Sequence, residues 1–149
     1  MFRFAVLAAL LVVASATEFR ACQNPVNPAA VRVQGCEKMP CDIVKGKDAI
    51  IEVDFTAKKL ANTLHAKIVA NAAGIHVPYP LPENLGNVCK NLLNDGYCPL
   101  DANEDATYKL VLPVATGYPL IPVAIEVSIV DEETKVHSCF IIDIIVRKN

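Results

Sequence analysis

The side chains able to carry out chemistry in this sequence are cysteine, serine and histidine, and their spacing argues against catalysis. All six cysteines follow residue 16, and an even number in an exported domain predicts disulfides rather than reactive thiolates. Beyond residue 16 the chain has two serines, Ser128 and Ser138, and neither stands in the G-x-S-x-G sequence of a nucleophile turn. We therefore expect no nucleophilic enzyme.

The histidines are equally poor candidates for a metal site or a catalytic base. His65, His76 and His137 show neither the H-x-x-x-H nor the H-E-x-x-H spacing of metal ligands, so we expect no metal and no cofactor. Adjacent residues of a strand point to opposite faces, so His137 and Ser138 cannot form a dyad. We expect all three histidines to be solvated surface residues, with a pH-dependent role as the alternative for His76.

The most distinctive stretch is apolar and reads G-I-H-V-P-Y-P-L-P at 74–82. Its prolines at 78, 80 and 82 lack an N–H group, so the stretch cannot lie in the middle of a sheet. It must be an extended edge or a rim. Four apolar side chains lie on it: Ile75, Val77, Tyr79 and Leu81. A stiff apolar rim that does not pair suggests a gate to an apolar interior.

The elements that would position this rim are strands, because apolar and polar residues alternate along most of the chain. In 49–57, for example, Ile51, Val53 and Phe55 share one face. Alternation of this kind predicts strands at 31–34, 49–57, 63–71, 107–115, 121–129 and 136–146. Short strands separated by turn signals predict an all-β sandwich.

The apolar content of 53% is high, but it does not decide how the interior is filled. Alternation predicts a solid core by default, and the same residues line a cavity if the two sheets splay apart. Ala66 and Ala70 fall on the inner face of the predicted strand at 63–71, where small side chains leave volume unfilled. Composition alone therefore does not decide between a solid core and a lined cavity.

The two ends of the chain predict an exported single domain. Arg3, a short apolar run and A-S-A at 14–16 are typical of a signal peptide, so we expect residues 1–16 to be removed and 17–149 to form one domain. The six cysteines allow fifteen pairings. Spacing favours Cys36 with Cys41 and Cys89 with Cys98, which leaves the two terminal cysteines for each other. The formal net charge of −2 offers no basic surface to nucleic acid.

Several motifs together resemble a known family. The run G-I-H-V-P-Y-P-L-P-E at 74–83 is followed by C-P-L at 98–100, D-x-x-Y at 105–108 and L-P-V-x-x-x-Y-P at 112–119. With the signal peptide and the cysteine pattern, these motifs resemble the Niemann-Pick type C2 branch of the ML (lipid-recognition) domains. The resemblance implies an immunoglobulin-like β-sandwich of two antiparallel sheets, with an apolar cavity between them that holds a sterol or another lipid.

The resemblance also implies an entrance to that cavity. Its family motifs place Tyr79, Val114 and Tyr118 around the entrance, with Val77 as a neighbouring wall residue. We expect four further apolar residues to contact the ligand: Ile75, Leu112, Phe55 and Ile68. The family motif has Phe where this chain has Tyr79, which adds a hydroxyl at the mouth. We expect the hydroxyls of Tyr79 and Tyr118 to face a ligand head group. The family pairs its cysteines as 22–139, 36–41 and 89–98, in agreement with the spacing argument.

The chain also departs from its relatives. The loop between Cys89 and Cys98 is longer than in the sterol-transfer relatives, and the family's D-C-G around the first cysteine is A-C-Q here. No N-x-S/T sequence is present, and glycan-based sorting to lysosomes would need one. These departures favour a secreted carrier.

We therefore expect a soluble, monomeric, extracellular carrier of fatty acids, sterols or similar lipids, in lipid transport or chemosensory ligand delivery. A membrane or a receptor would touch the rim of the cavity. One alternative is an innate-immune lipid-recognition module that acts with a receptor, and another is intracellular sterol transfer in the endosome or lysosome. A hydrolytic or steroid-metabolising enzyme ranks last.

Overall fold

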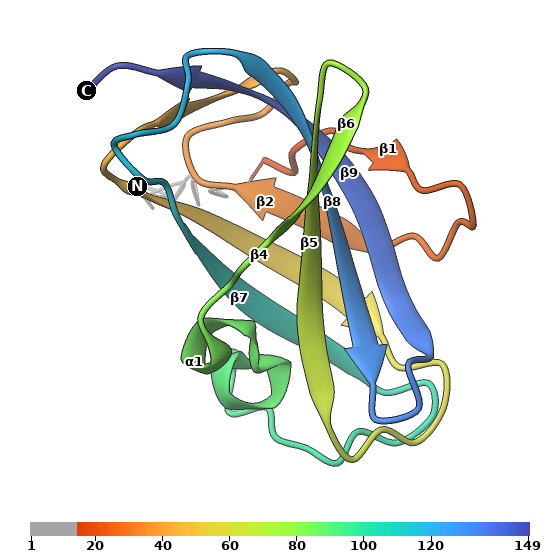
Figure 1. The fold of residues 1–149 in the computed structure, drawn as a ribbon. Coiled ribbons are helices and arrows are strands. Elements are labelled where there is room, and N and C mark those ends of the chain that lie inside the picture. The colour runs from red at the N-terminus through yellow and green to blue at the C-terminus, as the bar shows by residue number, and fades with distance from the viewer. Residues whose placement is uncertain (1–14) are drawn as a thin grey trace, which may run out of the picture.

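Two β-sheets packed face to face make up the fold in the computed structural model, which describes residues 15–149 (Figure 1). The predicted signal peptide falls almost entirely on residues 1–14, outside the described residues, and stays a prediction. Among residues 15–149, no helix has the length and the apolar character needed to cross a membrane.

The first sheet has six strands and the second has three. The larger sheet runs in the order β1 (Arg20–Ala21), β9 (Val136–Arg147), β8 (Pro122–Asp131), β5 (Leu64–Ala72) and β6 (Ile75–Tyr79), with β3 (Cys41–Val44) also paired to β9. The smaller sheet runs β2 (Ala30–Val33), β4 (Asp48–Thr56) and β7 (Asp105–Pro113). The predicted all-β sandwich is confirmed, and its pairings are antiparallel except that β3 lies parallel to β9.

The six predicted strands correspond to β2, β4, β5, β7, β8 and β9. The sequence did not predict the short strands β1 and β3, nor the helical segment between β6 and β7, which contains α1 (Glu83–Gly86) and the 3-10 helix η1 (Val88–Asn91). This segment lies against both β5 and β7, so it covers one open side of the sandwich. The hydroxyl of Tyr108 on β7 donates a hydrogen bond to the carbonyl of Leu85 at 2.6 Å and holds the segment in place.

Within the stretch at 74–82, Ile75 to Tyr79 form the edge strand β6, which is one of the two predicted forms, an extended edge or a rim. A tight turn at Ala73 and Gly74, both with positive φ, connects β5 to β6 and suits the twist of a hairpin. The expectation that the stretch does not pair was wrong, because Ile75 to Tyr79 pair with β5. Pro78 in β6 and Pro80 just beyond its end lie two residues apart, so both remove donors from the same side of this extended segment. The side of β6 that pairs with β5 needs its N–H donors, so the prolines must face the outer edge. Without these donors, the outer edge is protected from the addition of another strand.

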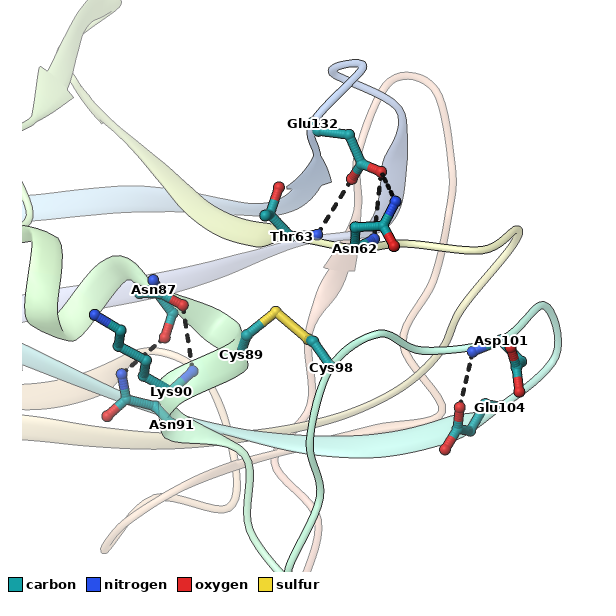
Figure 2. The surroundings of a disulfide bond; sticks show 10 residues. All are labelled: Asn62, Thr63, Asn87, Cys89, Lys90, Asn91, Cys98, Asp101, Glu104 and Glu132. Atoms are coloured by element: carbon teal, nitrogen blue, oxygen red, sulfur yellow. Dashed lines mark hydrogen bonds between the residues drawn. A yellow bond between two sulfur atoms is a disulfide. The ribbon is translucent and has the colours of Figure 1, made fainter.

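The three disulfides join Cys22 to Cys139, Cys36 to Cys41 and Cys89 to Cys98, which confirms the predicted pairing. The first connects the N-terminal segment to β9 across 117 residues. The third closes the loop that follows α1, as Figure 2 shows.

The expectation of a solvated His137 was wrong. Its side chain is fully buried, its Nδ1 accepts the N–H of Lys58 at 3.0 Å, and its Nε2 lies 2.8 Å from an oxygen of Asp131. The loop that contains Lys58 is far from His137 in the sequence. Alternation along β9 could therefore not reveal that this loop covers His137. Ser138 is buried as well, and within residues 15–149 its hydroxyl has no hydrogen-bond partner.

Candidate functional site

The two sheets separate at one end of the sandwich and enclose a cavity of about 430 Å³. We call this the open end; it is where the β5–β6 hairpin and the β7–β8 loop lie, at 72–75 and 114–121. The volume falls within the roughly 300–1,000 Å³ typical of small-molecule sites. The wall consists of Ile68, Ala70, Ala72, Val77, Pro78, Tyr79, Pro80, Leu112, Pro113, Val114, Tyr118, Pro119, Ile121, Val123, Ile125, Ile144 and Val146.

The chemistry of this wall is almost entirely apolar. No lining residue carries a charge, and the only polar side-chain groups are the hydroxyls of Tyr79 and Tyr118. Such a surface offers neither a nucleophile nor a cation ligand. It can bind an apolar molecule by removing that molecule from water, at about 0.8 kcal/mol for each buried CH₂ group.

The cavity exists because small side chains occupy the inner face of β5 at this end. Ala70 pairs with Val77 of β6 on one side and Ile125 of β8 on the other, and Ala72 pairs with Ile75. An alanine leaves the space that a larger core residue would fill, and the rigid strands do not collapse onto it. At the other end of β5, the fully buried Leu64 fills the interior.

Two half-buried tyrosines belong to the wall, and we call the side where the wall residues Val77 and Ile121 are exposed the mouth of the cavity. Tyr79 comes from the edge strand β6 and Tyr118 from the β7–β8 loop, and their rings meet edge to face with centroids 6.4 Å apart. The hydroxyl of Tyr79 donates a hydrogen bond to the carbonyl of Pro113 on β7. Burial, and then the neighbouring Tyr118, raise the pKa of Tyr79 above its ordinary value, so the hydroxyl keeps its proton.

The structure brings most of the predicted ligand contacts to this one place. Six of the eight predicted residues line the cavity: Tyr79, Val114, Tyr118, Val77, Leu112 and Ile68. Ile75 does not line it and is 65% exposed at the start of β6. Phe55 is 1% exposed and lies in the core at the opposite end of β4. Contact with a ligand stays a prediction for all eight.

Several wall residues escaped the sequence analysis. Ile125 on β8, and Ile144 and Val146 on β9, were assigned to inner faces but not to a cavity. Ile125 could have been found, because it pairs with Ala70, which in turn pairs with Val77 of the proline-rich stretch. Ile144 and Val146 pair with residues of β8 and β3, so the proline-rich stretch gave no signal for them. The small side chain of Ala70 predicts unfilled volume, and Ala72 two residues later carries the same signal.

Exposed apolar side chains surround the mouth, and we call them the apolar rim. The rim consists of Ile75 and Val77 on β6 and Leu120 and Ile121 on the β7–β8 loop, which are 37–65% exposed. Isolated exposed apolar residues are ordinary, so four of them on two neighbouring segments are the feature of the rim that calls for an explanation.

Outside the cavity, one group of side chains has the proximity that a metal site needs. Cys22, Glu126 and Cys139 come close together, but the two sulfurs are joined in a disulfide and offer no thiolate. Within the part of the chain that the structure describes, this group therefore supports no metal site.

Comparisons with known proteins agree with the geometry. A family model described as an ML domain matches residues 16–146. The NPC intracellular cholesterol transporter 2 of Bos taurus is 31% identical over 114 residues, which cover 76% of this chain and 73% of the transporter.

Solved structures show the same fold. A Niemann-Pick type C2 protein from Japanese carpenter ant superposes with a TM-score of 0.76 at 20% identity, over 87% of this chain and 99% of that one. Chicken MD-1 complexed with lipid IVa superposes with a TM-score of 0.55 at 14% identity, over 83% of each chain.

Proposed function

Because the chain belongs to the ML-domain family, we propose that it is a carrier that binds small hydrophobic ligands, such as fatty acids or sterols, in the cavity between its sheets. The observation that carries this proposal is the 430 Å³ cavity whose wall contains no charged residue. A protein without a ligand would ordinarily fill this volume with side chains, because an unfilled interior is destabilising.

The expected affinity follows from apolar burial. A chain of ten buried CH₂ groups gives about 8 kcal/mol before the cost of association is subtracted. That gross value corresponds to about micromolar binding, and longer chains offset the cost of ordering the ligand. The protein would then select ligands by the length and cross-section of their apolar part, with little contribution from polar contacts.

The names of similar proteins support a lipid as the cargo. The Bos taurus relative is named as a cholesterol transporter, and the chicken MD-1 structure contains lipid IVa. We propose an extracellular, monomeric carrier for lipid transport or chemosensory delivery. The predicted signal peptide supports export, and three disulfides are typical of an oxidising compartment.

A second candidate is an innate-immune recognition module that presents a lipid to a receptor. The apolar rim favours it, because Ile75 at 65% exposure and Val77 at 53% are available to a partner. Intracellular sterol transfer is the third candidate. A sterol as the only extractable cargo would favour transfer, and capture of a receptor together with bound lipid would favour recognition.

The test is ligand binding by the purified, disulfide-bonded protein. We expect native mass spectrometry to detect lipid that survives purification, and we expect a fluorescent fatty acid or sterol to bind and to be displaced. If no lipid is extracted and neither probe binds, the carrier function is refuted. Turnover of a lipid ester would also contradict it.

Val114→Phe is the matching variant, because Val114 lines the cavity and a phenyl ring would occupy part of its volume. Excluding two CH₂ groups of the ligand costs about 1.6 kcal/mol, or roughly tenfold in affinity. The control is Val111→Phe, the same exchange at a half-buried position of β7 that is not part of the cavity wall. Equal affinities in the two variants would show that ligand does not enter here.

A further inference from the structure

One hydrogen bond crosses the mouth of the cavity from one sheet to the other. Its donor is the hydroxyl of Tyr79, on the edge strand of the larger sheet, where Tyr79 pairs with Ile68 of β5. Its acceptor is the carbonyl of Pro113, the last residue of β7 in the smaller sheet, where Pro113 pairs with Asp48 of β4. The bond therefore joins two strand edges that have no ladder between them.

The backbone explains why this carbonyl is available. The N–H of Val114 donates to the carbonyl of Lys47 and the carbonyl of Val114 accepts the N–H of Gly46, so the groups of Val114 face the β4 side. Successive residues of a strand direct their backbone groups to opposite sides, so the carbonyl of Pro113 faces away from β4. In the described structure, Tyr79 supplies the donor that an adjoining strand would otherwise give.

We propose that this Tyr79–Pro113 hydrogen bond determines specificity by limiting the width of the mouth, so that a single acyl chain enters more easily than a fused-ring sterol. The inference rests on the proposed carrier function and names its ligand class. The hydroxyl of Tyr79 already donates to Pro113, so only its acceptor lone pairs are left for a ligand head group, and that contact stays a prediction.

The two ligand classes differ in cross-section. A flexible acyl chain is one methylene wide and can pass beside the bonded pair. A rigid ring system is wider, so it must separate β6 from β7 and displace the ring of Tyr118, which packs edge to face on Tyr79. We infer that the strands stay apart while the sterol is bound, so the lost hydrogen bond lowers sterol affinity as well as the rate of entry. The prolines at 78 and 80 fix φ on both sides of Tyr79, and this stiffness resists such a separation.

Removing the hydroxyl alone tests the idea. Tyr79→Phe keeps the ring, its edge-to-face contact with Tyr118 and the wall of the cavity. It removes the hydroxyl, and with it the bond to Pro113 and the polar interaction with Tyr118. Tyr108→Phe is the matched control, because the hydroxyl of Tyr108 also donates to a carbonyl, that of Leu85, and is not part of the cavity wall. Both variants lose one tyrosine hydrogen bond, so a general loss of stability affects both.

The experiment measures dissociation constants for a fluorescent polyene fatty acid and a fluorescent sterol with the wild-type protein and both variants. We expect Tyr79→Phe to shift the ratio of the two constants toward the sterol by about threefold to tenfold, the equivalent of one net hydrogen bond. Sterol association should become faster by a similar factor. Tyr108→Phe should leave the ratio at its wild-type value.

An unchanged ratio in Tyr79→Phe, or an equal shift in Tyr108→Phe, overturns this inference while wild-type binding upholds the carrier function. If neither probe binds to the wild-type protein, the carrier function itself fails and the inference fails with it.

Discussion

The two ends of the sandwich are built from the same strands but have opposite interiors. At the closed end, where the β4–β5 loop meets the β8–β9 hairpin at 57–63 and 131–136, Phe55, Leu64 and Ile129 are fully buried and fill the space between the sheets. At the open end β5 presents Ala70 and β9 presents Val146, and a cavity remains.

The two ends also differ in which segments their hydrogen bonds connect. At the closed end the carboxylate of Glu132 accepts the N–H groups of Asn62 and Thr63 and the side-chain amide of Asn62, as Figure 2 shows. At the mouth of the cavity, the bond from Tyr79 to Pro113 joins the two sheets. The closed end thus stabilises the fold, which allows the other end to keep an unfilled interior.

The largest expected difference between the two ends is the loss in free energy of unfolding when an isoleucine is replaced by alanine at each end. Ile129→Ala removes a fully buried residue from the closed end and should lower the free energy of unfolding by about 4 kcal/mol, including the cost of the new void. Ile144→Ala enlarges a cavity that already exists and should cost about 2 kcal/mol. Urea denaturation of both variants measures this difference, and equal losses would mean that the ends are packed alike.

The next effect concerns the buried carboxylate of Asp131 at the closed end. Burial alone would raise its pKa, but hydrogen bonds from His137 and from the N–H groups of Lys135 and Glu133 outweigh burial and lower it. A lowered pKa in the folded state stabilises the protein above the unfolded pKa of about 3.9, and this contribution is lost as pH falls through the folded value.

Asp131→Asn should therefore reduce stability at pH 7 by about 2–3 kcal/mol, because it removes a charged acceptor from three donors. Its effect should shrink as the pH approaches 3, since the wild-type protein loses the same contribution there. Thermal unfolding at both pH values gives the comparison. Ligand affinity at pH 7 should not change, and a loss of affinity would show that the two ends are coupled.

Much of the fold could be predicted from the sequence, because alternation reports which face of a strand is buried. Strand β4 is the clearest case, with Ala49, Ile51, Val53 and Phe55 all buried. Strand β3 could not be found in this way. It has four residues, and it is held by a parallel pairing with β9 about 100 residues later in the chain.

The site could be predicted in part for the same reason. The proline-rich stretch located the mouth, but alternation continues unchanged from Phe55 in the solid core to residues near the cavity, so it could not show where the core ends. The acceptor of Tyr79 lies 34 residues away on the other sheet, and the cover of His137 comes from Lys58, 79 residues earlier. These contacts depend on how the sheets stack, which no local pattern records.

The smallest expected effect comes from variants that add side-chain volume instead of removing it. These variants are also the sharpest test of the difference between the two interiors. Ala61→Leu places three extra carbons in the closed end, where Ala61 is fully buried, and should destabilise the protein by about 1–2 kcal/mol through overpacking. Ala70→Leu places them in the cavity, where free volume accepts them, so stability should change by about 0.5 kcal/mol or less while affinity for a fluorescent fatty acid falls. Thermal unfolding and probe titration measure the two quantities on each variant. If Ala70→Leu destabilised the protein as much as Ala61→Leu, the open end would have no room for a leucine, and a carrier with no such room could not take up an acyl chain.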